Sequence, residues 1–411
     1  MKQYGRLPFS GVFIFIIVLS SCISFKYSSN IEASDSGIKK VVEGNALFAI
    51  DLYKRLKTTE GNVFFSPYSI STALAMTYGG AREETARQMA AALHFSLESE
   101  TLHSAFADIQ LKLNAIQQEQ KIQLSSANSL WPQDKYPFLK KYLEFTKKHY
   151  RTEITAVDYV TNAGDAREKI NSWVEEKTKK KIKNIISRPP DPLTRLILVN
   201  AIYFKGNWAS QFTVSATTKM PFHLNENRAI QAPMMHQKSK FNYSEDGNVQ
   251  TLELPYSGQK LSMLVIVPKK KEGLQNLEET LTKDSLEGWT RDASERNVAV
   301  YLPRFKMTSE FRLDEELKSM GIKDAFDMNK ANFSGMDGNP NWLYIGAVLH
   351  KAFIVVNEEG TEAAAATGVR MGVKSAPEYV VFRADRPFFF LIRENDTGSI
   401  LFMGRVINPA F

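Results

Sequence analysis

The chain of 411 residues contains one cysteine, six histidines, no proline- or glycine-rich linker within its body, and no internal repeat. One cysteine cannot form a disulfide within the chain, so burial of apolar side chains must stabilise the fold even in an oxidising compartment. Because no linker divides the chain, we expect one large domain instead of the two or three that its length allows. Hydrophobic residues make up 43% and charged residues 24%, a composition that excludes intrinsic disorder.

The sequence also lacks the motifs that carry common enzyme chemistry. It contains no Gly-x-Ser-x-Gly elbow, His-Glu-x-x-His pair, Walker loop or Gly-x-Gly-x-x-Gly fingerprint. The sole thiol, Cys22, lies in the leader described below, and His350 is better explained as a buried hydrogen-bonding residue than as a catalytic base. We therefore expect no enzymatic activity, no metal and no cofactor. The net charge of +7 is modest for this length and does not predict nucleic-acid binding.

The N-terminus has the pattern of a targeting segment. Lys2 and Arg6 form a short positive region, and the apolar run at residues 12–19 is too short to span a bilayer. The Leu-Ser-Ser-Cys sequence that ends at Cys22 resembles the lipobox of bacterial lipoproteins, in which the cysteine is lipidated after cleavage. The alternative is an ordinary secretory signal with an incidental cysteine.

This leader predicts the organisation of the whole chain. We expect residues 1–21 to be a signal peptide, residues 22–37 a flexible tether, and residues 38–411 the folded domain. The domain would lie outside the cytoplasm of a bacterial cell. It would be attached through Cys22 to a membrane or cell surface, or secreted.

Hydrophobic periodicity predicts helices in the first half of the chain and strands in the second. Helical patterns occupy residues 39–57, 68–78, 82–93, 165–186 and 313–320. Strand patterns occupy residues 63–65, 196–204, 250–254, 261–267, 297–302, 353–357, 379–382, 388–392 and 400–406. Because helices and strands do not alternate as βαβ units, the pattern predicts an α+β fold.

The segment at residues 358–375 has the pattern of a strand with one small, uncharged face. Every charge between Thr361 and Lys374 falls on one face of the strand, and no proline interrupts the segment. Such a segment is suited to two states, an exposed loop and a strand inserted in a sheet. The alternative is a surface loop of small residues whose alternation is incidental. The uncharged face would carry Thr361, Ala363, Ala365, Thr367, Val369, Met371 and Val373.

Four motifs, in order, resemble the serpin family over almost the whole chain, from about residue 45 to residue 411. They are NVFFSPYSI at residues 62–70, LVNAIYFKGNW at 198–208, FRADRPF at 382–388 and LFMGRVINP at 401–409. The resemblance implies an α+β fold of three β-sheets and eight or nine helices. It also implies an exposed reactive-centre loop at about residues 358–378.

The same resemblance implies roles for individual residues. The hinge of the loop would comprise Glu358, Gly360, Thr361, Ala363, Ala365 and Thr367. A polar cluster that controls strand separation, the shutter, would comprise Ser66, Ser69, Asn200 and His350, and Trp208 would mark the breach where insertion begins. Counting seventeen positions from the hinge glutamate places the scissile bond at Lys374–Ser375, with Arg370 as the other basic candidate.

The implied function is inhibition of a trypsin-like serine protease by a monomer that acts as a suicide substrate, because a lysine before the scissile bond suits a carboxylate-bearing S1 pocket. The small hinge residues are those of inhibitory members. The alternatives are a non-inhibitory serpin, acting as a carrier, chaperone or adhesion module, and an inhibitor of papain-like cysteine proteases. The basic run from Lys177 to Lys183 is read as a solvated helix face, with polyanion binding as the alternative.

Overall fold

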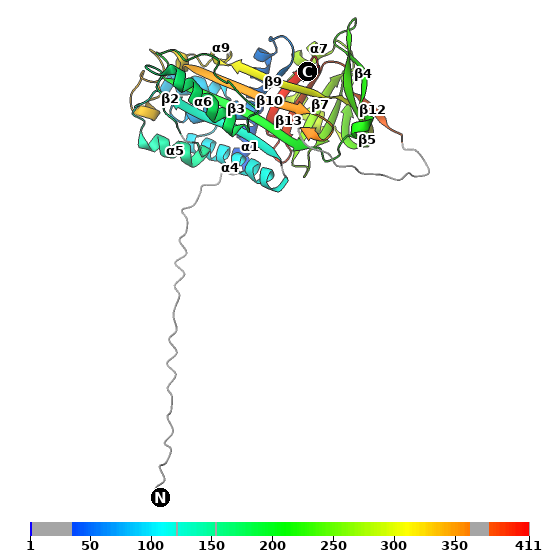
Figure 1. The fold of residues 1–411 in the computed structure, drawn as a ribbon, viewed down its shortest axis with the longest axis horizontal. Helices are drawn as coiled ribbons and strands as arrows, with labels where there is room; N and C mark the ends of the chain where they lie inside the picture. Colours follow the sequence, from blue (N-terminus) through cyan, green and yellow to red (C-terminus); the bar gives the residue numbers. More distant parts are fainter. Residues whose placement is uncertain (2–34, 121, 153, 362–377, 411) are drawn as a thin grey trace. The chain divides into compact units, whose positions relative to one another are not determined.

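The computed structural model describes residue 1 and residues 35–410, apart from residues 121, 153 and 362–377 (Figure 1). The predicted signal peptide and nearly all of the predicted tether lie outside the described residues. The first described helix begins at Asp35, inside the segment predicted as tether. The predicted site residues that fall outside the described part are Cys22, Ala363, Ala365, Thr367, Lys374 and Ser375.

Helices dominate the first half of the described chain, as predicted. The helix at residues 67–78 is buried all round, and Ser66 caps it by accepting a hydrogen bond from the Ser69 backbone N–H at 3.2 Å. The α-helices are α1 (Asp35–Leu56), α2 (Pro67–Tyr78), α3 (Glu83–Ala92), α4 (Ser99–Gln120), α5 (Lys140–Tyr150), α6 (Ala163–Lys177), α7 (Leu274–Glu279), α8 (Lys283–Arg291), α9 (Asp314–Ser319) and α10 (Ser334–Asp337).

The smaller of two hydrogen-bonded sheets positions the candidate site. Its strands are β2 (Gln123–Pro132), β3 (Leu196–Asn207), β9 (Phe305–Arg312), β10 (Ala347–Val356) and the short β11 (Gly360–Thr361). β3 pairs antiparallel with β2 and parallel with β10, and β10 pairs antiparallel with β9. The sheet is therefore ordered β2-β3-β10-β9, and Figure 1 shows these strands side by side.

Helices cover both faces of this sheet, which explains why β3 is a continuous apolar run. On one face, Ile170 and Val174 of α6 join a core cluster with Val199 and Ala201 of β3. On the other face, Leu74 of α2 belongs to the main core, which also contains alternate residues of β3. Each face of β3 therefore packs into a different hydrophobic core.

The larger sheet contains the remaining strands. It runs β1-β14-β13-β7-β6-β5-β8-β12, with β4 paired to β5. Its strands are β1 (Val63–Phe65), β4 (Thr218–His223), β5 (Ala229–Glu245), β6 (Val249–Pro255), β7 (Leu261–Pro268), β8 (Ser294–Pro303), β12 (Val380–Arg383), β13 (Phe388–Glu394) and β14 (Ile400–Val406).

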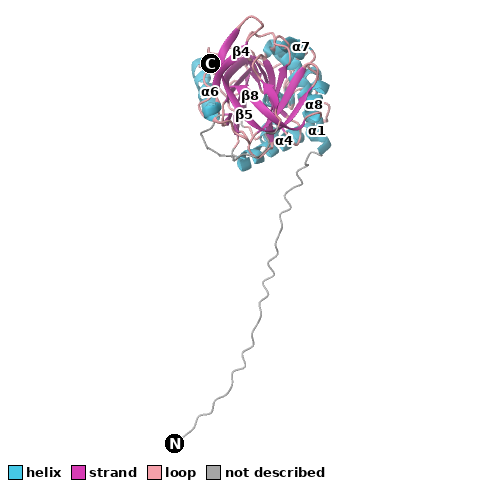
Figure 2. Cartoon of the chain, turned by 90° about the vertical axis from the view of Figure 1, so that its right-hand side faces the viewer, coloured by secondary structure: helices cyan, strands magenta, loops and turns pink. Residues whose placement is uncertain are grey.

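The long β5 explains why three expected sheets appear as two hydrogen-bonded networks. Its first part pairs with β4, its residues from 234 to 243 pair with β8, and its last residues pair with β6. Figure 2 shows β4, β5 and β8 facing the viewer, with helices around them. β5 therefore belongs to two of the expected sheets and joins them into one network. The predicted α+β class is confirmed.

One predicted helix is too long. The pattern at residues 165–186 predicts a single helix, but α6 ends at Lys177. Thr178 ends it because its hydroxyl donates to the Val174 carbonyl at 2.7 Å and accepts from the Ile182 backbone N–H at 3.1 Å. Lys179 then takes a positive φ of 51°. Ile182 is nevertheless fully buried, so its apolar side chain continues the helical pattern without the helix.

Among the described residues, no helix combines the length and the apolar character needed to cross a membrane.

Candidate functional site

The described part of the predicted hinge, residues 358–361, begins a new strand beside the end of β3. Gly360 lies opposite Asn207 and Thr361 lies opposite Gly206 in an antiparallel ladder. Thr361 is 0% exposed, and its hydroxyl is 3.1 Å from the Tyr256 hydroxyl, also inside the core. The predicted first inward-facing residue of the loop is thus already seated in the sheet.

Trp208 fixes the chain where the hinge turns. Its indole Nε1 donates to the Asn357 carbonyl at 3.0 Å, and its backbone N–H donates to the Glu359 carbonyl at 2.9 Å. Its ring stacks on Tyr256 with centroids 4.7 Å apart. The predicted placement of Trp208 beside the start of insertion is consistent with these contacts.

Gly360 is the one hinge position that only glycine fits. Its φ is +152°, and a Cβ built there would lie 2.1 Å from the Gly206 carbonyl oxygen and 2.6 Å from Asn207 Cα. Any side chain would therefore push the hinge away from β3. The close approach of two backbones explains the residue.

A buried ion pair anchors the start of the hinge. Glu358 is 3% exposed, forms a salt bridge with Arg304, whose Nε donates to Glu358 Oε1 at 2.6 Å, and accepts a hydrogen bond from the Thr217 hydroxyl. Burial alone would raise the pKa of the Glu358 carboxyl, but the hydrogen bonds from Arg304 and Thr217 outweigh it and lower the pKa. The Glu358 carboxylate therefore stays ionised and is held in place at the point where the chain enters the predicted loop.

The shutter cluster, defined as Ser66, Ser69, Asn200 and His350, is brought together as predicted. Asn200 and His350 occupy paired positions in the parallel β3–β10 ladder, and His350 Nδ1 donates to Asn200 Oδ1. The Asn200 amide nitrogen donates to Ser69 Oγ at 2.5 Å. The cluster thus ties β3 to β10 and to the first turn of α2.

The hydrogen bonds assign the protonation state of His350. The Ser66 backbone N–H can only donate, and it lies 3.1 Å from Nε2, so Nε2 carries no proton. The amide oxygen of Asn200 can only accept, so Nδ1 carries the proton and the ring is neutral. Burial lowers the pKa of His350 to about 3, in agreement with this assignment.

This buried histidine predicts a pH-dependent stability. Between pH 6.5 and about 3 the unfolded chain binds a proton that the folded ring does not, so stability falls as the pH falls through this window. Each such histidine contributes about 1.4 kcal/mol per pH unit. We expect His350→Asn to reduce the slope of unfolding free energy against pH by this amount between pH 4 and 6, measured by urea unfolding. An unchanged slope would mean that the folded ring is protonated there.

Two residues of the cluster were missed by the sequence analysis. Ser126 and Asn128 of β2 extend it: Asn128 Oδ1 accepts from Ser69 Oγ at 3.0 Å and from the Asn200 amide, and Ser126 Oγ lies 3.0 Å from Ser69 Oγ. The available signal is their alternation, because both fall between the buried Leu124 and Leu130 at a spacing of two. Polar residues on the inward face of a strand indicate a buried network.

The contacts of this site hold strands in position relative to one another. The site is therefore better suited to a rearrangement of strands than to a chemical reaction. Within the described ranges, no group of three or more metal-ligating side chains is found. The site instead joins a hinge seated beside β3 to a polar cluster that holds β3 against β10.

Comparisons with known proteins agree with this geometry. A family model described as Serpin (serine protease inhibitor) matches residues 43–409. The leukocyte elastase inhibitor of Xenopus laevis is 43% identical over 372 residues, which cover 88% of this chain and 97% of that protein. An uncharacterized serpin-like protein of Thermococcus kodakarensis is 43% identical over 375 residues, covering 90% and 86%.

Solved structures give the same result. Uncleaved ovalbumin is 34% identical, has a TM-score of 0.81 and covers 90% of this chain and 100% of its own. Serpin48 of the insect Tenebrio molitor is 32% identical, with the same TM-score of 0.81, and the match covers 90% of this chain and 98% of that structure. The predicted fold is therefore confirmed.

Proposed function

The chain belongs to the serpin family, and on that premise we propose that it is a monomeric protein inhibitor of serine proteases that acts as a suicide substrate and not as an enzyme. The observation that carries the proposal is the seated hinge. Gly360 and Thr361 already pair with β3 as the strand β11, next to the end of β10. Insertion of the loop would extend a ladder that has begun.

The register of β11 supports insertion of the predicted loop beside β3. Continuing it one residue at a time would place Thr367 opposite Asn200 and Met371 opposite Leu196, the first residue of β3. Side chains on the same face as Thr361 would enter the main core, where the predicted face is small and uncharged. Thr367 is a polar residue on that face. It would lie beside the side-chain amide of Asn200, which loses its hydrogen bond to His350 when β3 and β10 separate.

The sheet also offers a driving force for insertion. β3 and β10 pair in parallel from Ile197–Ala347 to Tyr203–Phe353. A strand that descends between them would be antiparallel to both, so one parallel ladder would be replaced by two antiparallel ladders. Antiparallel pairing is slightly more stable per residue, and the new strand adds its own hydrogen bonds and buried side chains. The uninserted fold would then be held by a kinetic barrier.

The proposed inhibition proceeds by interrupted proteolysis. The serine hydroxyl of the protease would attack the Lys374 carbonyl, and the bond to Ser375 would break, releasing the amine of Ser375 and leaving an ester between Lys374 and the protease. Insertion of the freed loop would carry the attached protease along the sheet. The protease active site would be distorted before water hydrolyses the ester.

The target class follows from Lys374. A lysine at this position favours trypsin-like proteases, which bind a basic side chain. The relatives named leukocyte elastase inhibitors carry a different target in their names. Target choice depends on the loop more than on the fold, so we propose trypsin-like specificity for this chain.

Titration with trypsin tests the proposal against a non-inhibitory serpin. We expect a covalent complex that survives SDS, with a mass equal to trypsin plus the chain lacking its fragment from residue 375 onward. Mass spectrometry of the released fragment should show Ser375 as its first residue. Cleavage without a complex would contradict inhibition and favour a carrier, chaperone or adhesion role. A complex formed only with papain would favour cysteine proteases.

A further inference from the structure

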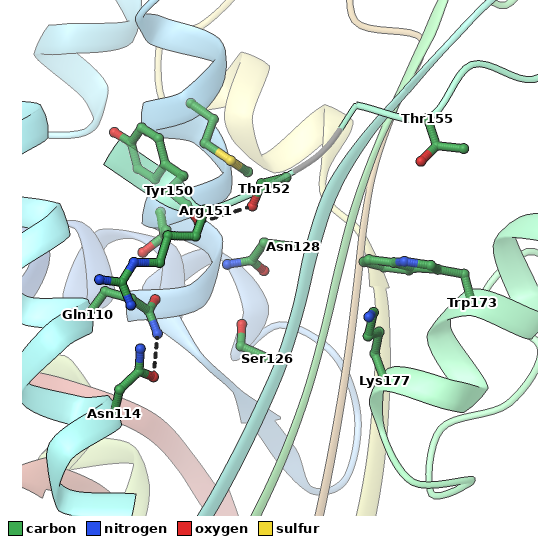
Figure 3. Close-up of a pocket in the computed structure, with 12 residues that line it drawn as sticks. Gln110, Asn114, Ser126, Asn128, Tyr150, Arg151, Thr152, Thr155, Trp173 and Lys177 are labelled. Atoms are coloured by element: carbon green, nitrogen blue, oxygen red, sulfur yellow. Dashed lines mark hydrogen bonds between the residues drawn. The ribbon is translucent and has the colours of Figure 1, made fainter. Parts of the chain in front are cut away.

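A groove of about 900 Å³ lies between α1, α3 and the turn that follows α9. It is separate from the cavity beside β2 shown in Figure 3, which contains Ser126 and Asn128 and belongs to the shutter site described above. The lining of the groove comes from the last two turns of α1, from α3 and the residue His94 shortly after it, and from residues 319–323. Three segments that are distant in the sequence therefore form one surface.

Side-chain contacts between these segments hold the groove in shape. His94 Nε2 lies 2.8 Å from Asp51 Oδ2, which ties the end of α3 to α1. Gln88 of α3 accepts hydrogen bonds from the backbone N–H groups of Lys323 and Asp324, both at 2.9 Å, through its side-chain oxygen. The groove is therefore formed before any partner arrives, and a partner would lose little affinity to ordering it.

The charged side chains of the groove favour an acidic partner. Both of its carboxylates already have a basic neighbour: one contacts the histidine just described, and the other, Glu84, forms a salt bridge with Arg87 at 2.6 Å. Among the described residues, three exposed cations of the groove form no ion pair, namely Lys54, Arg55 and Lys323. Guanidinium and ammonium groups bind carboxylates through charge-assisted hydrogen bonds. The groove therefore has spare capacity for negative charge and none for positive charge.

The exposure of these cations favours a peptide over a small anion. One ion pair in contact with water contributes little to binding, so a single carboxylate would be held weakly. Several carboxylates on one chain would combine their contributions. Between the cations the groove is lined by the apolar side chains of Ala91, Ala92 and Met320. An apolar side chain of the ligand could lose its water there.

We propose that this groove is a docking surface for an acidic segment of a partner protein, in which carboxylates flank one apolar side chain. The carboxylates would bind Lys54, Arg55 and Lys323, and the apolar side chain would contact Met320. This binding does not depend on the proposed inhibitory function.

The groove and the hinge lie at opposite ends of the smaller sheet. α9 begins at Asp314, directly after β9, and Arg312 of β9 pairs with Leu349 near the start of β10. The hinge follows Val356, at the other end of β10. Ten residues of strand span about 33 Å, and Figure 1 shows α9 and β12 toward opposite ends of the molecule. A docked partner would therefore hold the protein in place and leave the predicted loop free.

Fluorescence anisotropy with a labelled peptide tests the binding to the full chain. The probe has seven residues, with leucine at the centre and glutamate at the other six positions. We expect saturable binding that weakens with added salt, because the ion pairs are exposed. The same peptide with glutamines should not bind, and replacement of its leucine by glycine should weaken binding. Absence of binding, or equal binding of the leucine and glycine peptides, would overturn the proposal. Tighter binding of a sulfated polysaccharide at the same groove would overturn the choice of a protein partner.

A charge-matched pair of triple variants locates the site. Lys54→Gln, Arg55→Gln, Lys323→Gln should bind the acidic peptide at least about tenfold more weakly, since three exposed ion pairs are lost together. The control removes the same two lysines' and one arginine's worth of charge from exposed positions outside the groove, and it should bind within about twofold of the unmodified chain. Its substitutions are Lys169→Gln, Arg188→Gln and Lys219→Gln. Equal losses in both variants would mean that the overall charge of the surface attracts the peptide.

A second pair of variants separates charge from shape inside the groove. Ala91 is an exposed residue in the last turn of α3, and glutamate and glutamine are both good helix formers. Ala91→Glu places a carboxylate among the cations and should weaken peptide binding at least about tenfold. Ala91→Gln adds a side chain of the same shape without the charge and should weaken it less than about threefold. Equal binding by both variants would overturn the role of the cations.

Trypsin inhibition measured with the acidic peptide bound tests the separation of groove and loop. A saturating amount of the peptide should leave the rate of complex formation unchanged. A slower rate would overturn the inference that a docked partner leaves the loop free. Failure of the trypsin titration without peptide would overturn the proposed inhibition alone, because the anisotropy measurement contains no protease.

Discussion

A chain carrying Thr361→Arg is expected to be cut by trypsin without trapping it. Thr361 is fully buried in β11, with its hydroxyl beside that of Tyr256. A guanidinium at this point would have to lose its water without gaining an acidic partner, at a cost of several kcal/mol. Insertion would then stall at its first residue, and water would hydrolyse the acyl-enzyme before the protease is distorted.

The measurement is the ratio of SDS-stable complex to cleaved chain at equal trypsin. We expect the complex to fall at least tenfold while the rate of loop cleavage stays the same. Two controls separate charge from position. Thr361→Ser keeps the hydroxyl and should still form the complex, and Glu362→Arg places the same charge on the neighbouring residue, predicted to face outward. Stable complexes with Thr361→Arg would contradict insertion as the mechanism.

Replacing Lys374 with leucine is expected to change the target of the inhibitor. The lysine would form an ion pair with a carboxylate inside the S1 pocket of a trypsin-like protease, and a leucine leaves that carboxylate buried and unpaired. Loss of one partner of such a pair costs about 2 kcal/mol or more, or about thirtyfold in rate. Lys374→Leu should therefore inhibit trypsin at least about thirtyfold more slowly and inhibit chymotrypsin faster.

Arg370→Leu serves as the matched control, because it removes the other basic residue of the loop. It should leave trypsin inhibition unchanged if Lys374 precedes the scissile bond. The β11 register supports this choice: continued, it sets Met371 opposite Leu196, the first residue of β3, so cleavage after Lys374 would leave enough chain to fill the sheet. Retained trypsin inhibition by Lys374→Leu, with loss in Arg370→Leu, would place the bond at Arg370.

The sequence predicts the elements and the shutter cluster better than it predicts their connections. The strand at residues 63–65 is observed with the predicted bounds, and β3 is buried on both faces as its apolar run indicates. The resemblance placed Asn200 and His350 in one cluster, and the structure joins them by a hydrogen bond. These features follow from local patterns and from motifs that are continuous in the chain.

Other features depend on contacts between distant residues, which no local pattern encodes. Arg304 lies between β8 and β9, and Thr217 lies directly before β4, yet both side chains contact Glu358. Each is an ordinary polar residue in its own part of the sequence. Tyr256 lies directly after β6, yet it supports Thr361 more than 100 residues later. The predicted helix at residues 165–186 failed for the same reason, because Ile182 is buried by tertiary packing after the helix has ended.

The parallel ladder between β3 and β10 has a consequence for the amount of this protein that a cell must make. If the proposed insertion replaces that ladder by two antiparallel ones, no step of the mechanism leads back, and each molecule would act only once. Dilution would not release the captured protease, as it does for an inhibitor that dissociates. The number of inhibitor molecules, and not their affinity for the protease, would therefore limit the protection. The rate of synthesis would set how much proteolysis the surroundings of the cell can withstand.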